Sequence, residues 1–119
     1  MSESPVLDPA VLNTLRQLSS PGEPDVLAEV LKLFLAEVPP RIVRLRIAYA
    51  AQNIEEVHRS AHSLKGSAGN VGAQRMFDIC KRLDEIGKSG DLRGAGSLVD
   101  ALGAEFGKVE AEIHRLVEV

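Results

Sequence analysis

Aromatic residues are scarce in this sequence, at 3% of 119 residues, and tryptophan is absent. The core therefore has to be built mainly from aliphatic side chains. The shortage also argues against a protein that binds single-stranded nucleic acid, because such proteins stack bases on aromatic rings. The formal net charge is -3, from 14 basic and 17 acidic residues, and indicates no basic surface for a phosphate backbone. We expect no nucleic acid partner.

Cysteine and long apolar runs are also scarce. Cys80 is the single cysteine, which excludes a disulfide within the chain and favours a reducing compartment. No apolar run approaches the roughly 20 residues that span a bilayer. The segment 1–9 holds two acids and does not resemble a secretory signal. These features predict a cytoplasmic protein with no membrane partner, and the length predicts one domain over residues 1–119.

Apolar residues recur at helical spacing along nearly the whole chain, and the alternation typical of strands is essentially absent. A short helix is expected after Asp8, which suits the capping position, with Pro9 in its first turn. Four longer helical patterns follow the loop at 19–24, and their apolar positions span 27–49, 54–71, 76–86 and 98–116. Asn53 and Glu56 form a possible capping box.

Two details of these helices are predicted from prolines and glycines. Pro39 and Pro40 lie inside the second pattern, but the apolar spacing keeps its phase across them, so we expect one bent, continuous helix. The segment 87–91 contains two glycines and is expected to be a loop. Short connections make successive helices antiparallel. The predicted fold is all-α, an up-down four-helix bundle (25–119) with an N-terminal capping helix and loop (1–24).

His62 is placed on the outward side of the third helix. At about 100° per residue it falls roughly 130° from the centre of the apolar stripe. Arg59 and Lys65 lie three residues before and after it, so both cations are its helix neighbours. Gly66 and Gly69 occupy the same outward side, where each costs about 1 kcal/mol relative to alanine. Glycine there leaves room for another protein to approach, although Gly69 fits a helix end equally well.

This arrangement suits phosphoryl transfer. A neutral imidazole nitrogen is a nucleophile, and a histidine with an ordinary pKa of about 6.5 is mostly neutral at pH 7. The histidine has to be exposed, because the phosphoryl donor arrives on another protein. Nearby cations stabilise the charge that spreads over the transferring oxygens.

The segment HSLKGSA (62–68), continued by NVGA (70–73), resembles the signature of the histidine-containing phosphotransfer (HPt) family. The resemblance extends from about Asp25 to the C-terminus. It implies that His62 is phosphorylated, that Lys65 stabilises the phosphoryl group, and that Gly66 gives a receiver domain access.

The resemblance also implies the partners. They are a response-regulator receiver domain, whose aspartyl phosphate exchanges with the histidine and which binds Mg²⁺ itself, and a hybrid sensor histidine kinase. Arg59, Ser63 and Gly69 are expected on the docking surface. The chain would have no cofactor of its own and would be a monomeric phosphorelay carrier of a two-component system. No Gly-rich nucleotide-binding motif is present, so a kinase is not expected.

Two other functions stay open. A helical adaptor without covalent chemistry would bind its partners equally well with His62→Gln. A metal-binding bundle would use His58 and His62, which lie four residues apart, but two ligands make a weak site. Under the phosphotransfer hypothesis, His58 is a residue on the helix shoulder, and His58→Ala should leave transfer largely intact.

Overall fold

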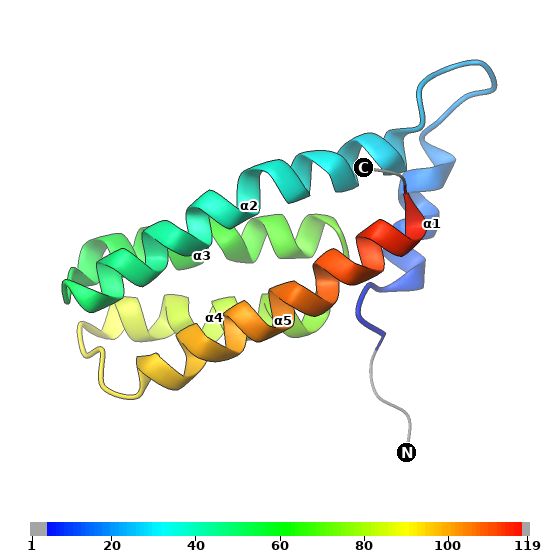
Figure 1. The fold of residues 1–119 in the computed structure, drawn as a ribbon. Helices are drawn as coiled ribbons and strands as arrows, with labels where there is room; N and C mark the ends of the chain where they lie inside the picture. The colour runs from blue at the N-terminus through cyan, green and yellow to red at the C-terminus, as the bar shows by residue number, and fades with distance from the viewer. Residues whose placement is uncertain (1–4, 118–119) are drawn as a thin grey trace.

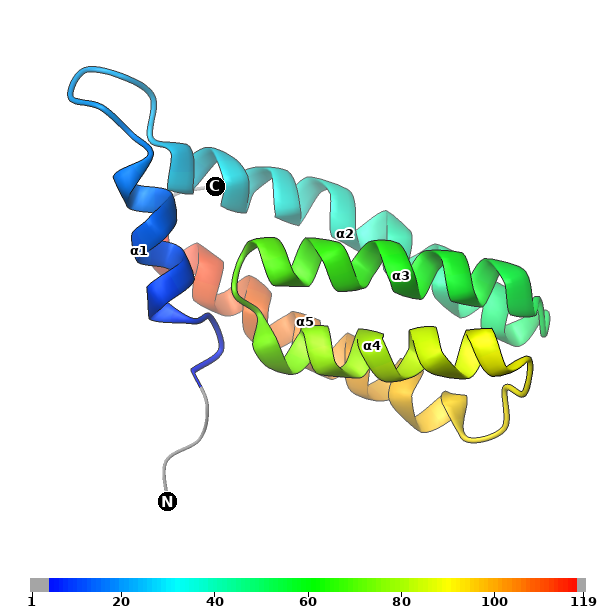
Figure 2. The same cartoon turned by 180° about the vertical axis from the view of Figure 1, so that it is seen from behind.

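The computed structural model describes residues 5–117, which form helices and no strand. The helices are α1 (Pro9–Gln17), α2 (Val26–Ala50), α3 (Ile54–Asn70), α4 (Gln74–Ser89) and α5 (Ala95–Leu116). The four long helices run up and down as antiparallel neighbours (Figures 1 and 2). α3 packs between α2 and α4, and α5 closes the bundle by packing against α2 and α4. The predicted all-α bundle with a short N-terminal helix is confirmed.

α1 lies across the end of the bundle (Figure 2) and is anchored to the turn between α3 and α4. The backbone N–H of Asp8 donates to the carbonyl oxygen of Gly72 at 2.8 Å. Gly72 has a positive φ of 75°, which favours glycine, and a Cβ there would lie 2.9 Å from Cβ of Val11. The turn after α3 therefore needs glycine both for its backbone and for the contact with α1.

Side-chain caps begin three of the helices. The Asp8 carboxylate accepts from the N–H of Ala10 at 2.9 Å, as predicted, and Asp25 caps α2 in the same way. Asn53 caps α3 by accepting from the N–H of Glu56 at 3.2 Å. The reciprocal half of the predicted capping box is not formed, because the Glu56 side chain bonds to residues later in α3.

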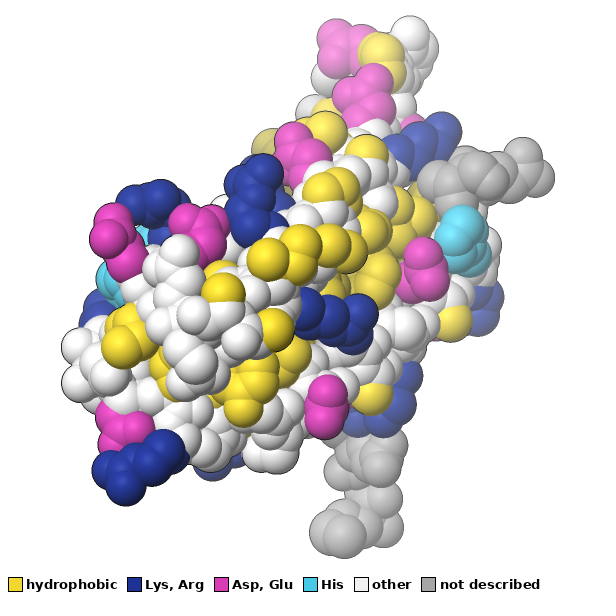
Figure 3. Space-filling view, turned by 60° about the vertical axis from the view of Figure 1, so that its left-hand side comes forward, with side chains coloured by type: hydrophobic (Ala, Val, Ile, Leu, Met, Phe, Trp, Pro, Cys, Tyr) yellow, Lys and Arg dark blue, Asp and Glu magenta, His cyan; other side chains and the backbone are white. Residues whose placement is uncertain are grey.

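α2 passes through Pro39 and Pro40 without interruption, so the prediction of a continuous helix is confirmed. Its buried residues keep one phase on both sides of the prolines. The outer side of α2 is also apolar, since Leu33, Val43 and Ile47 are exposed. Figure 3 shows hydrophobic side chains gathered on the face turned to the viewer. Over residues 5–117, no helix is both long and apolar enough to cross a bilayer.

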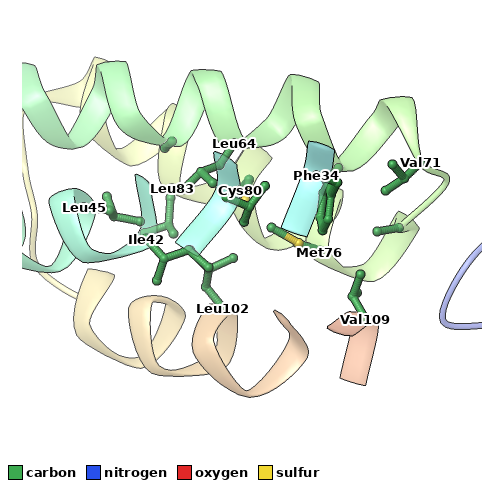
Figure 4. Close-up of a cluster of buried hydrophobic side chains, with 14 of the residues drawn as sticks. Phe34, Ile42, Leu45, Leu64, Val71, Met76, Cys80, Leu83, Leu102 and Val109 are labelled. Carbon is green, nitrogen blue, oxygen red and sulfur yellow. The ribbon is translucent and has the colours of Figure 1, made fainter. Parts of the chain in front are cut away.

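The core is aliphatic and lies between the four long helices (Figure 4). Each long helix contributes side chains that are almost completely buried, among them Leu31, Leu45, Leu64, Leu83 and Leu102. Cys80 is buried among them, and burial raises the pKa of its thiol to about 12, so the thiol stays protonated. Ile54 is the first of the apolar positions predicted over 54–71, and it is 38% exposed because it begins the helix.

The prediction that residues 87–91 form a loop is wrong for its first part. α4 continues through Ser89 and ends at Gly90, whose φ of 78° is left-handed. Gly87 lies inside the helix and faces α3. A Cβ at this position would lie 2.7 Å from both Cα and Cβ of His58. The glycine therefore permits a close approach of α3 and α4 and does not end the helix.

Gly87→Ala is expected to destabilise the protein by about 1–3 kcal/mol, as overpacking does, although alanine has the better helix propensity. Gly107→Ala is the matched control, since a Cβ at Gly107 in α5 meets no atom within 4 Å. That variant should gain up to about 1 kcal/mol. Urea unfolding followed by circular dichroism measures both, and a shift of the two variants in the same direction would contradict the packing argument.

Candidate functional site

His62 lies in the middle of α3, on the side away from the core. Its side chain is 64% exposed, whereas its neighbours Ala61 and Leu64 are completely buried. The structure thus places this imidazole where helical periodicity predicts it. A partner protein can reach the ring without any change in the bundle.

Asp84 of α4 lies beneath His62, and its side chain is only 2% exposed. The Oδ2 atom of Asp84 is 3.1 Å from Nζ of Lys65, 3.5 Å from Nδ1 of His62 and 3.9 Å from Nζ of Lys88. The Oδ1 atom is 2.9 Å from Nε2 of His58. A buried carboxylate on one helix is therefore surrounded by two imidazoles and two ammonium groups.

The Asp84 carboxyl is ionised in this setting. Burial by itself raises the pKa of the group, because it disfavours the charged form. Hydrogen bonds from Lys65 and His62, with the charges of Lys65 and Lys88, act in the opposite direction and prevail. The pKa of Asp84 is consequently lower than its ordinary value, and the carboxylate remains an acceptor at neutral pH.

An ionised carboxylate defines the proton position on His62. Such a group only accepts hydrogen bonds, so the ring nitrogen that faces it has to be the donor. Nδ1 of His62 is therefore the donor in this contact, and Nε2 is the ring nitrogen that does not face the carboxylate. The distance of 3.5 Å is at the outer limit of a hydrogen bond. Catalytic hydrogen bonds are often long in a free protein and tighten in its reacting complex.

The two glycines on the outward side of α3 differ in their surroundings. A Cβ at Gly66 meets no atom within 4 Å, so the space beside it is open. A Cβ at Gly69 would contact the Phe77 ring at 3.5 Å, which is an ordinary van der Waals distance. Open space next to His62 is thus a property of Gly66 more than of Gly69.

Arg59 and Lys65 were both predicted to be within reach of a phosphoryl group on His62. Lys65 bonds to the carboxylate under His62. Arg59 pairs instead with Glu55 at 2.8 Å and with Glu56 at 3.1 Å, on the preceding turn of α3. Of these two cations, Lys65 is therefore the one that shares a carboxylate with the imidazole.

A basic hollow lies beside the site, between α2 and α3, with a volume of about 230 Å³. Three arginines and Ser63, the residue after His62, line it; the full lining is Arg41, Arg44, Glu56, Arg59, Ser60 and Ser63. Arg59 and Ser63, two of the three predicted docking residues, thus lie on one surface, whereas Gly69 does not line this hollow.

The structure does not join His58 and His62 into a metal site. Their ring centroids are 6.3 Å apart, and each ring faces a different oxygen of Asp84. Among residues 5–117, no group of three potential ligands is arranged to hold a metal ion.

Asp84 is the site residue that the sequence analysis missed. It occupies the core-facing row of α4 together with Met76, Cys80, Leu83 and Gly87. An acidic residue inside a core-facing row indicates a carboxylate with charged or hydrogen-bonding partners, since carboxylates are almost never fully buried unless they are paired. The partner helix that pairs with it cannot be identified from the row itself.

Fold and site together define a helical bundle that exposes one histidine above a buried carboxylate. The model of the Hpt domain family matches residues 29–118. The crystal structure of histidine-containing phosphotransfer protein B from Pseudomonas aeruginosa PAO1 superposes with a TM-score of 0.87 at 28% identity, covering 95% of both chains. The chain belongs to the Hpt domain family, as the signature around His62 predicts.

Plant proteins are among its relatives. Histidine-containing phosphotransfer protein 2 of Arabidopsis thaliana is 26% identical over 103 residues, which are 84% of this chain and 66% of the relative. Histidine-containing phosphotransfer protein 5 of Arabidopsis thaliana is 35% identical over 69 residues, which are 56% of this chain and 44% of the relative. The chain thus spans about half to two thirds of the length of these two relatives.

Lys65→Met should raise the pKa of Asp84, because burial then acts with less opposition from hydrogen bonds. A lowered carboxyl pKa contributes stability above the unfolded-state value, and this stability is lost as the pH falls through the folded-state pKa. Acid destabilisation of the variant should therefore begin at a higher pH. Carbon-13 NMR titration of the Asp84 carboxyl measures the shift.

Lys88→Met is the control for this titration. Nζ of Lys88 is further from the carboxylate, at 3.9 Å, and the side chain is 61% exposed, so the shift should be smaller. Equal shifts in the two variants would show that net charge, and not the Lys65 hydrogen bond, lowers the pKa of Asp84.

Proposed function

We propose that this chain is a phosphorelay intermediate of a two-component signalling system. His62 accepts a phosphoryl group from the aspartyl phosphate of a receiver domain, or from a kinase, and passes it to another receiver domain. One observation carries the proposal. An exposed imidazole has Nδ1 turned to a buried, ionised carboxylate, which leaves Nε2 as the nucleophile.

The transfer step balances without any proton transfer. The Nε2 lone pair of His62 forms a bond to phosphorus while the bond from phosphorus to the receiver's carboxylate oxygen breaks, and the electron pair leaves with that carboxylate. Nδ1 keeps its proton, so the ring becomes positively charged. The Asp84 carboxylate stabilises this charge, as a carboxylate does for an imidazolium. The reverse step follows the same path, so transfer runs in both directions.

Two neighbours of His62 have supporting roles in this proposal. Lys65 turns from Asp84 toward the phosphoryl oxygens and stabilises their charge. Gly66 leaves the space through which the receiver brings its aspartate to Nε2. The Mg²⁺ ion belongs to the receiver domain, and this chain contributes no cofactor.

The docking surface includes the basic hollow between α2 and α3. Arg59 and Ser63 line the hollow next to His62, and its arginines suit an acidic rim around a receiver's phosphorylation site. Gly69, one turn beyond Gly66, extends the same exposed side of α3. We expect a receiver domain and a hybrid sensor histidine kinase to use this surface in turn.

In this function the chain is a carrier and not a kinase, because no nucleotide-binding motif accompanies the histidine. The nucleophile and its orientation come from this protein, whereas the phosphoryl donor and the metal come from the partner. We expect it to act in the cytoplasm as a monomer.

Mixing the protein with a receiver domain that has been phosphorylated by acetyl phosphate and Mg²⁺ should produce an acid-labile phosphoryl group on this chain. His62→Gln should abolish the label, because the variant lacks the nucleophile. His114→Gln, which replaces an exposed histidine of α5, should retain it. Quantitative labelling with phosphorus-32 provides the measurement.

The alternative functions give different results. Label on His62→Gln would move the phosphorylated residue elsewhere, with His58 as the next to test. No label on the wild type across several receivers, with receiver binding unchanged in His62→Gln, would favour the adaptor function.

Gly66→Gln should slow transfer by at least about tenfold, since misplacing the reacting groups by about 1 Å costs up to a hundredfold. The bundle should stay folded because the added side chain enters open space. Gly107→Gln, at an equally open position of α5, should transfer at the wild-type rate. A large loss of helicity in Gly66→Gln, seen by circular dichroism, would count against the access argument.

A further inference from the structure

His58 and Asp84 make a contact that the transfer step above does not use. Nε2 of His58 is 2.9 Å from Oδ1 of Asp84, and both atoms are buried. The contact is within ion-pair distance but lacks hydrogen-bond geometry, and neither atom has a hydrogen-bonding partner among residues 5–117. Two lone pairs repel each other at such a distance, so a proton on Nε2 of His58 makes this contact favourable. The two buried atoms therefore have each other as a close polar partner.

We propose that His58 is a positioning residue for phosphoryl transfer, which holds Oδ1 of Asp84 so that Oδ2 stays beneath Nδ1 of His62. This inference rests on the proposed function. It departs from the expectation, based on the sequence alone, that His58→Ala leaves transfer largely intact.

The planarity of the carboxylate connects the two imidazoles. Rotation about the Cβ–Cγ bond of Asp84 moves both oxygens together, so a partner that holds Oδ1 also fixes Oδ2. His58 and His62 lie four residues apart and share one face of α3, with Asp84 opposite both. The orientation of the His62 ring thus depends on a residue one turn away that lies outside the HSLKGSA segment.

The same contact matters more once His62 is phosphorylated. Lys65 bonds to Oδ2 before transfer and turns to the phosphoryl group afterwards. Lys88 is more distant and largely exposed, so it offers weak compensation. His58 and the charged His62 ring then remain as the close partners of the buried carboxylate. A buried carboxylate without partners is costly, so His58 makes it easier for Lys65 to leave.

His58 also has a packing role, because its backbone lies against Gly87. The two roles are separable. Packing depends on the backbone and on the volume of the side chain, whereas positioning depends on a proton donor that reaches Oδ1.

Three variants separate them. His58→Leu keeps an apolar volume and removes the donor. His58→Gln supplies an amide N–H donor on a side chain of similar length. His114→Leu makes the same change as the first variant on an exposed site of α5. For each variant, nitrogen-15 NMR measures which ring nitrogen of His62 is protonated, and quenched-flow labelling measures the rate of transfer from a phosphorylated receiver.

In the wild type we expect His62 protonated at Nδ1. His58→Leu should show a mixture of the two His62 tautomers and transfer about tenfold more slowly, the factor expected when one close polar contact to a buried charge is lost. His58→Gln should recover most of the Nδ1-protonated tautomer of His62 and most of the transfer rate. His114→Leu should match the wild type in both measurements.

The results distinguish this inference from the proposed function. Absence of label on the wild type overturns the proposed function itself. Normal labelling of the wild type, with an unchanged His62 tautomer and rate in His58→Leu, overturns the positioning role alone. If His58→Leu loses its helical circular dichroism signal, the variant is unfolded and cannot test the positioning role. The His62 tautomer in the wild type and in His58→Gln then tests it. A His62 ring protonated at Nε2 in either protein contradicts the inference.

Discussion

Burying the Asp84 carboxylate takes a negative charge out of water, and the groups around it offset that cost. Two imidazoles and two ammonium groups converge on its oxygens from both helices of the α3–α4 pair. In the proposed function this constraint determines which nitrogen of His62 is protonated and which is nucleophilic. It also keeps Lys65 next to the imidazole before any phosphoryl group arrives. The exposed imidazole thus lies against a charge that is itself almost completely buried.

The bundle provides the rigid support that this arrangement needs. α3 presents His62 on its outer side while Ala61 and Leu64, on the opposite side, are anchored in an aliphatic core. In the proposed function the donor and the metal come with the partner, so the chain needs no cavity and no flexible lid. Its proposed contribution is one nucleophile with a defined proton, displayed beside open space at Gly66. A surface of this kind suits a carrier that meets more than one partner.

Helical periodicity is sufficient to predict the bundle, because each long helix has a continuous apolar stripe and the connections between helices are short. It also predicts the exposure of His62, which lies off the stripe of its helix. The same periodicity fails for Asp84. It treats every position of a stripe as apolar. The hydrogen bonds that compensate this buried acid come from α3, 19 residues away in the chain for Lys65 and 22 for His62. Gly87 was misjudged for a similar reason. A glycine needed for contact between two helices looks the same in sequence as a glycine that ends one.

The glycine at position 87 also limits how the site can be engineered. The distance from α4 to the histidines of α3 depends on a residue that has no side chain and lies outside the HSLKGSA segment. Grafting that segment onto a helix of an unrelated bundle would reproduce the exposed imidazole but not the carboxylate beneath it. The smallest transferable unit is therefore a pair of helices, with the acid and the glycine on one and the histidines and the lysine on the other. A search for such sites in other bundles has to compare helix pairs instead of motifs.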